Sequence, residues 1–334
     1  MGIATERLST RLGSVVGGLL NSTLSNAPEL IIGIVALRNG LGRVVKASLT
    51  GSIMVNLLVG LGCALVVGGL KYGVHSFDRR QLRSSGLMLV MCGFCFIVPA
   101  VFRIGTPQGT RDLSLELSFI LLAIYVGNVM INIFDGRRAM QDATMQTGDK
   151  KESYTAGRSL AVLGLSGIAL AGVSEAVTLS LIPATRTLGF SDTFSGIVLL
   201  GGVGGIGEVL TAIRFARQGK QELVMAATVG STIQMVLFVA PLLVFTGLVV
   251  GESMDLSFSM FEVVSIVLAI IIAREIINAG KATWIEGLML LATYFILAIG
   301  FYHLPDAVVE RDRSAAEGDL MPTVQPGAQN AQGG

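Results

Sequence analysis

Residues 26–52 read NAPELIIGIVALRNGLGRVVKASLTGS, and residues 205–231 read GIGEVLTAIRFARQGKQELVMAATVGS. Aligned without a gap, the two stretches form an internal repeat whose copies lie 179 residues apart. The matching positions are Glu29 and Glu208, Ile34 and Ile213, Arg38 and Arg217, Gly40 and Gly219, Val45 and Val224, Ala47 and Ala226, and Gly51-Ser52 and Gly230-Ser231. Each glutamate lies in a long apolar run, where an ionisable residue is costly and suggests a functional site. Two glutamates at equivalent places predict one site at the interface of the repeats.

The composition is that of a membrane protein. Hydrophobic residues make up 52% of the 334 residues and charged residues only 14%, whereas soluble domains are about a quarter charged. We therefore expect a multi-pass integral membrane protein in contact with the lipid bilayer. The net charge is +1, and Lys and Arg are spread over the connections instead of forming a basic stripe, which excludes a nucleic-acid partner.

Nine apolar runs are long enough for a helix to cross a hydrocarbon layer about 30 Å thick. They predict an all-α polytopic membrane protein with spans at residues 14–37, 45–70, 84–103, 115–135, 158–182, 193–214, 222–249, 257–278 and 284–302.

One connection is much longer than the others. Residues 136–157 form a charged linker, predicted to divide a first half (1–135, four spans) from a second half (158–303, five spans). Residues 304–334 are polar and rich in Gly, Ala, Gln and Pro, so we expect a disordered tail.

The connections fall alternately on two sides of the membrane. The side that includes residues 136–157 carries 16 Lys and Arg residues and the other side 8, so the first side is predicted to be cytoplasmic. An odd number of steps separates the span of Glu29 from the span of Glu208. The two spans should therefore cross in opposite directions, which makes the repeats inverted, as in many secondary transporters.

In the first repeat, Asn26 and Glu29 share one helical face, and Pro28 lies between them. Proline removes a backbone donor and clashes with the preceding turn, so the helix is predicted to bend or break there. The exposed carbonyl oxygens, the Glu29 carboxylate and the Asn26 amide oxygen are hard ligands that suit Ca²⁺. A proline kink with a satisfied polar residue is the alternative interpretation.

In the second repeat, five glycines within GGVGGIG (residues 201–207) precede Glu208 and are predicted to break that helix. Gly202, Gly204 and Gly207 match the dinucleotide pattern GxGxxG, but that motif requires a preceding strand and a soluble helix, which an apolar span does not offer. Close packing of helices through small residues is the alternative explanation for the glycines.

Two further helices offer polar groups. Ser52 and Asn56 are four residues apart, while Ser231 and Gln234 are three apart, so each pair shares a helical face. Hydrogen bonds between helices could explain each pair alone, but their convergence favours a polar central site. Ser48, Asn56 and Glu175 are possible accessory residues of this site.

Two nearby carboxylates in a poorly solvated cavity repel each other. Protons or a divalent cation must neutralise them, and their titrations should be coupled. Competition between Ca²⁺ and protons for Glu29 and Glu208 would then constitute an exchange mechanism.

Cys92-Gly-Phe-Cys95 has the spacing of a redox motif. It lies within a predicted membrane helix and lacks the βαβ context of a redox protein, so we interpret both cysteines as structural. We expect neither an enzymatic activity nor a cofactor, only transported ions.

Both repeats resemble the cation/proton exchanger branch of the Ca²⁺/cation antiporter superfamily. GGLLNSTLSNAPELIIGIVALRNGLGRVVKASLTGSIMVNLLVGLG is similar to the first repeat of that family, and GEVLTAIRFARQGKQELVMAATVGSTIQMVLFVAPLLV to its second. The resemblance extends from residue 4 to about residue 306. It implies an inverted-repeat exchanger with a core of ten helices that exchanges cytosolic Ca²⁺ for H⁺. It also implies the site residues: Glu29 and Glu208 as carriers of the transported ions, with Asn26, Ser52, Ser231 and Gln234 around them.

The sequence departs from the family pattern in three ways. Gly204-Gly205 stands where the family has Gly-Asn, Val209 stands where it has His, and residues 2–9 resemble the end of a preceding helix that is missing here. Two alternatives therefore stay open: a Na⁺- or K⁺-linked Ca²⁺ exchanger of the same fold, and a transport-inactive homologue that serves as a sensor or assembly subunit. The short loops suggest a bacterial inner membrane, and a homo-oligomer is possible.

Overall fold

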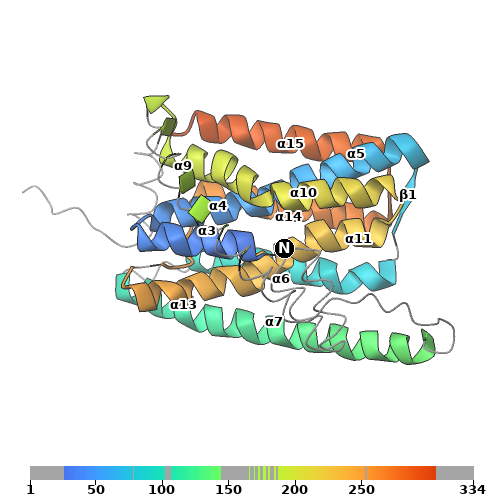
Figure 1. Ribbon diagram of the computed structural model, residues 1–334, viewed down its shortest axis with the longest axis horizontal. Coiled ribbons are helices and arrows are strands. Elements are labelled where there is room, and N and C mark those ends of the chain that lie inside the picture. The colour runs from blue at the N-terminus through green and yellow to red at the C-terminus, as the bar shows by residue number, and fades with distance from the viewer. Residues whose placement is uncertain are drawn as a thin grey trace, which may run out of the picture.

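The computed structural model describes residues 26–77, 79–101, 107–143, 187–252 and 254–305, together with isolated residues between 165 and 185. This part of the chain is almost entirely helical. Long helices lie side by side, and in the view of Figure 1 α7 and α15 lie at opposite edges of the bundle.

The first half contains α3 (Ala27–Arg38), α4 (Gly42–Met54), the π-helical segment η1 (Val55–Gly60), α5 (Leu61–Tyr72), β1 (His75–Ser76), α6 (Arg79–Val101) and α7 (Pro107–Ala143). The second half contains α9 (Asp192–Phe194), the π-helical η2 (Ser195–Leu200), α10 (Gly201–Arg217), α11 (Gln221–Met225), η3 (Ala226–Gly230), α12 (Ser231–Gln234), η4 (Met235–Val239), α13 (Ala240–Val250), α14 (Met260–Ala279), β2 (Lys281–Ala282) and α15 (Trp284–Tyr302).

Six stretches of the described residues are long and apolar enough to cross a membrane: Gly42–Tyr72, Leu82–Val101, Gln108–Ile131, Asp192–Arg217, Gln221–Val250 and Trp284–Tyr302. Each coincides with a predicted span. α14 matches the predicted span 257–278 in extent, but its three charged residues keep it out of the six. The structure describes residues 26–37 of the first span and only isolated residues of the span 158–182, so the count of nine stays a prediction.

α7 is longer than the sequence suggested. It continues to Ala143 and so includes the first residues of the predicted linker. The segment GRRAMQDA contains mostly good helix formers, which explains the extension. The division of the chain at residues 136–157 and the disorder of residues 304–334 stay predictions.

The turn that follows the repeated helix is the same in both halves. Gly40 and Gly219, which are equivalent in the repeat, have φ of 70° and 73°, a left-handed conformation that favours glycine. The backbone hydrogen bonds also correspond: Leu41 N donates to Ala36 O at 3.0 Å, and Lys220 N donates to Phe215 O at 3.1 Å. The internal repeat is therefore structural as well as sequential.

The contacts also give the direction of the repeated helices. α4 and its continuation lie beside α10 in the same direction, because Gly196 faces Ala47, Gly201 faces Gly51 and Gly205 faces Val55. α3 runs against α4, because a tight turn joins them, with Leu41 N bonded to Ala36 O, and because Glu29 of α3 and Ser52 of α4 both lie beside Gly204. The helices of Glu29 and Glu208 therefore run in opposite directions, as predicted for inverted repeats.

Connections assigned to the same side meet at the same end of the bundle. β1 pairs antiparallel with β2, with His75 opposite Ala282, and so joins the α5–α6 connection to the α14–α15 connection. At the other end, Lys46 Nζ lies 2.6 Å from Asp255 Oδ1, and Leu256 N donates to Ser114 Oγ at 3.0 Å. The contacts therefore agree with the predicted alternation of sides.

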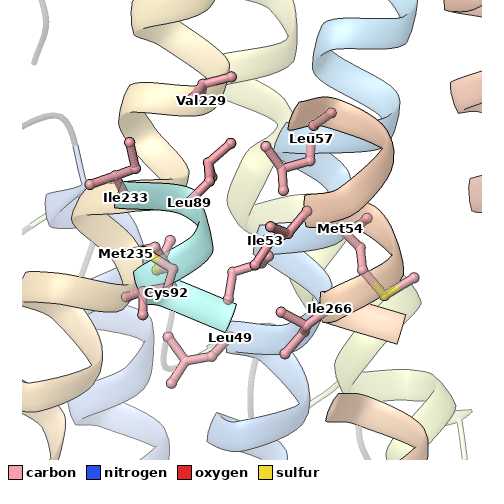
Figure 2. Close-up of a cluster of buried hydrophobic side chains, with 14 of the residues drawn as sticks. Leu49, Ile53, Met54, Leu57, Leu89, Cys92, Val229, Ile233, Met235 and Ile266 are labelled. Carbon is pink, nitrogen blue, oxygen red and sulfur yellow. The ribbon is translucent and has the colours of Figure 1, made fainter. Parts of the chain in front are cut away.

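The core is apolar and is shared by both halves. Figure 2 shows Ile53 and Leu57 of the α4–η1 helix, Leu89 of α6 and Ile233 of α12 in one cluster of buried side chains. Because backbone groups inside a bilayer must bond within their own helix, such packing of side chains holds the helices together.

Candidate functional site

Polar side chains of both halves meet at the start of α3. Asn26 Nδ2 donates to Gln234 Oε1 at 2.7 Å, and Ser231 Oγ donates to Asn26 Oδ1 at 2.9 Å. Asn26 is 1% exposed and Ser231 5% exposed. The network therefore lies inside the protein and joins residues more than 200 positions apart in the sequence.

Glu29 lies one helical turn from Asn26. Its side chain is buried, and neither carboxylate oxygen has a hydrogen-bond partner among the described residues. Its Cγ lies 3.8 Å from the place that a Cβ of Gly204 would occupy, so the side chain faces α10. A buried carboxyl group without a partner is costly, and it is the feature that a bound cation or proton would satisfy.

Glu29 opens onto a small pocket between α3, α4, η2 and α13. Ser48 and Ser52 contribute hydroxyl groups to its wall, and the remaining lining is apolar. Ser52 also lies beside α10, with its Oγ 3.3 Å from the Cβ position of Gly204. The predicted residues Glu29, Ser48 and Ser52 are thus brought together.

Glu208 lies on α10 one turn after Gly204 and is partly buried. Glu208 does not line the pocket of Glu29, so a site shared by the two glutamates stays a prediction.

The predicted break at GGVGGIG is wrong. α10 runs without interruption from Gly201 to Arg217, and the distorted segment η2 ends just before the glycines. The glycines serve close packing instead: a Cβ at Gly201 would lie 2.6 Å from the Cα of Gly51, and a Cβ at Gly51 would overlap the carbonyl oxygen of Ile197. Backbones this close require glycine on both helices.

Pro28 lies in the first turn of α3, which begins at Ala27. Proline is tolerated there because the first backbone donors of a helix have no partner within it. The residues that precede Asn26 lie outside the described part of the chain, so the predicted bend or break stays a prediction.

The glycine at position 205 has a structural reason. A Cβ there would lie 2.9 Å from Val55 Cγ1 and 3.4 Å from Asn56 Oδ1. Asn56 is fully buried, and its amide has no partner among the described residues. Gly205, which is equivalent to Asn26, has no side chain that could hold such a network, and Asn56 offers an amide to the space beside it. Val209 is the other departure from the family pattern. Its Cγ2 lies 3.7 Å from the place that a Cβ of Gly60 would occupy.

Several further residues have structural roles or lie outside the described part of the chain. Cys92 and Cys95 are free and buried, as the structural interpretation requires. Glu262 and Glu286 complete capping boxes at the starts of α14 and α15. Glu175 lies outside the described residues.

Sequence reasoning missed the π-helical segments. η1 follows Ser52, η3 precedes Ser231 and η4 follows Gln234, and η1 and η4 occupy nearly equivalent places in the repeat. Such segments often mark functional sites, but they have no known local sequence signature by which we could have found them.

Sequence reasoning also missed a buried ion pair. Lys46 on α4 contacts Asp255 at 2.6 Å and donates to the carbonyl oxygen of Ser257 at 3.0 Å, while Asp255 accepts from Ser257 N at 2.7 Å. The pair ties the first half to the α13–α14 connection. One feature of the sequence could have indicated this pair. Lys46 lies at the start of the predicted span 45–70, and Asp255 lies in a connection that is predicted on the same side of the membrane.

The described residues contain no group of three or more His, Cys, Asp or Glu side chains that could hold a metal ion.

A model of the sodium/calcium exchanger protein family matches residues 3–134 and 158–302 of the chain. The chain belongs to this family. It is 37% identical over 308 residues to the Ca²⁺/H⁺ antiporter ChaA of Bacillus subtilis (strain 168), covering 91% of this chain and 88% of that protein. It is 35% identical over 323 residues to a Ca²⁺/H⁺ antiporter of Aphanothece halophytica, covering 91% and 86% of the two chains.

The solved structure of native YfkE superposes on this family member with a TM-score of 0.78 at 34% identity and covers 91% of this chain and 87% of its own. The predicted resemblance to the Ca²⁺/H⁺ antiporter family is therefore confirmed. Together with the six apolar helices, it identifies an integral membrane protein of an exchanger family.

Proposed function

We propose that this protein exchanges Ca²⁺ for protons across a membrane by alternating access to a site that contains Glu29 and Glu208. The observation that carries the proposal is the Glu29 carboxyl group, which is buried beside α10 with no hydrogen-bond partner among the described residues. The names of the relatives support the choice of ions.

The chemistry follows from charge neutralisation. Two ionised carboxylates in a poorly solvated site repel each other and lose their hydration, so the doubly ionised empty site is the most costly state. Ca²⁺ or protons each remove that cost. If only the neutralised site can change the side to which it opens, inward movement of one ion requires outward movement of the other.

The neutral polar residues have separate roles in this proposal. Asn26 is held by Ser231 and Gln234, and this network would keep an amide oxygen oriented while the carboxylates exchange ions. Ser48 and Ser52 line the pocket of Glu29 and would replace water around the entering cation. Asn56 would supply an amide on the side of Glu208, where Gly205 offers none.

The test is Ca²⁺ uptake into proteoliposomes driven by an imposed pH gradient. Glu29→Gln and Glu208→Gln should each abolish uptake, because glutamine can neither carry a proton nor balance the charge of Ca²⁺. Glu275→Gln is the matched control, since Glu275 is exposed on α14, and it should retain uptake. Undiminished exchange in both site variants would refute the site.

The same vesicles separate the alternatives. Ca²⁺ uptake that follows a Na⁺ or K⁺ gradient at fixed pH would favour the other exchanger type. Absence of both Ca²⁺ uptake and Ca²⁺ binding by the intact protein would favour a transport-inactive homologue. By analogy with its bacterial relatives, we place the protein in a bacterial plasma membrane.

A further inference from the structure

The pocket of Glu29 extends toward the end of α3. Glu29 and Ser52 lie at its inner end, and Ala36 and Val45, next to the α3–α4 turn, lie at its outer end. Ala36 and Val45 are fully or almost fully buried. The pocket is therefore directed toward the membrane surface at which α3 ends, and buried side chains lie at its outer end.

Most of the walls are held by backbone connections. α3 and α4 are joined by a tight turn, with Leu41 N bonded to Ala36 O. α4 lies against η2 so closely that Gly51 has no room for a side chain beside Ile197. These helices cannot separate without breaking close backbone contacts.

The wall contributed by α13 differs. It reaches the pocket through Leu243, a fully buried side chain whose two Cδ atoms lie 2.8 Å from the Cβ position of Gly33. The contact is made by the far end of a flexible side chain, so a change of rotamer or a small shift of α13 can remove it.

The equivalent contact in the other half is built from different residues. The repeat relates Gly33 to Ala212 and Leu243 to Ala64. Ala212 and Ala64 are both buried, and their helices α10 and α5 pack on each other. At this pair of equivalent positions, a large side chain therefore faces a glycine on the side of Glu29, whereas two alanines occupy the places on the other side.

We infer that Leu243 is the gate residue that opens and closes the passage from Glu29 to the membrane surface at which α3 ends. The inference rests on the proposed function, since it identifies a further residue for the same exchange. In the closed state, the side chain of Leu243 packs against Gly33.

The test measures access to the pocket directly. Ser48→Cys places a reporter thiol in the pocket lining, and a positively charged methanethiosulfonate reagent is added to one side of right-side-out or inside-out membrane vesicles. Peptide mass spectrometry distinguishes the reporter from the native cysteines. Leu243→Ala should accelerate labelling at least about tenfold, because the shortened side chain no longer fills the passage and access no longer waits for a rare side-chain movement. The acceleration should occur only from the side at which α3 ends.

Gly33→Ala gives the opposite perturbation. The added methyl group fills the space between Gly33 and Leu243 and should slow labelling severalfold. Adding Leu243→Ala to the same chain should restore the rate of labelling. Leu89→Ala, a fully buried leucine of α6 away from the pocket, is the matched control and should leave labelling unchanged.

Two results would overturn the inference: Leu243→Ala labelling no faster than in the Leu89→Ala control, or equal acceleration from both sides. Slower labelling in Gly33→Ala that Leu243→Ala reverses supports the gate even if Leu243→Ala alone proves unstable. The assay requires no transport. If labelling changes as expected in these variants but the protein takes up no Ca²⁺, the proposed function is refuted and the role of Leu243 as a gate is still supported.

Discussion

Breaking the ion pair between Lys46 and Asp255 should be costly, and the structure gives the expected size. The side chains are 7% and 13% exposed, and removing one partner of a buried pair leaves an uncompensated charge at a cost of about 3–5 kcal/mol. Asp255 keeps the Ser257 N–H and Lys46 keeps the Ser257 carbonyl. We therefore expect the lower end, about 3 kcal/mol, for Lys46→Met and for Asp255→Asn.

The double variant distinguishes pairing from packing. With both charges removed, no buried charge is left unpaired, so the double variant should lose about 2 kcal/mol less than the sum of the two single losses. The assay is equilibrium unfolding of the purified protein in mixed detergent micelles with increasing dodecyl sulfate. Because ionic strength screens exposed charges more than buried ones, the difference should persist in high salt.

Arg274 and Glu275 supply the control pair. Their side chains lie 3.6 Å apart but are 40% and 66% exposed, so their coupling should stay below about 0.5 kcal/mol. A coupling of Lys46 with Asp255 as small as that of the control pair would refute the reasoning that this contact fastens the α13–α14 connection to α4.

The remaining predictions concern stability in the same assay. Burial lowers the pKa of His75 below its ordinary value and outweighs the opposing backbone hydrogen bond to Leu65, so the unfolded chain binds the proton more tightly. The contribution of His75 to stability should therefore be fully present above about pH 6.5 and fall as the pH drops through that value. His75→Leu should flatten this pH dependence. His303→Gln, which changes an exposed residue, should retain it. Gly51→Ala should cost about 3 kcal/mol or more, because its Cβ would overlap a backbone oxygen that cannot rotate away. Gly127→Ala, in open space on α7, should be neutral or gain up to about 1 kcal/mol, and equal losses in the two glycine variants would contradict the packing argument.

Much of the fold could be predicted because the bilayer restricts what a chain can do. A run of about 20 apolar residues must form a helix there, since backbone groups find no other partner. The spans around residues 45–70 and 222–249 were therefore readable from composition alone. The equivalence of Glu29 and Glu208 then followed from the repeat, without knowledge of any contact.

The errors arose where one residue type serves two purposes. Glycine can interrupt a helix or allow another helix to approach it, and GGVGGIG does the second. Which purpose applies depends on the partner, here Gly51, and the partner is not visible in the local sequence. Lys46 and Asp255 illustrate the same limit, because a pairing across 209 positions is decided by the assembled fold.

The repeated helices of the two halves have similar backbones, but equivalent positions carry different side chains. Asn26 holds a hydrogen-bonded network, whereas Gly205 at the equivalent place holds none. Gly33 accommodates a large side chain, whereas Ala212 occupies the equivalent place in a contact of small residues. A perfectly symmetric pair of repeats would treat both sides of the membrane alike, and an exchanger that moves different ions in opposite directions has no need of that equality. The asymmetry of the side chains, placed on symmetric helices, is therefore where we expect the preference of each side for Ca²⁺ or for protons to arise.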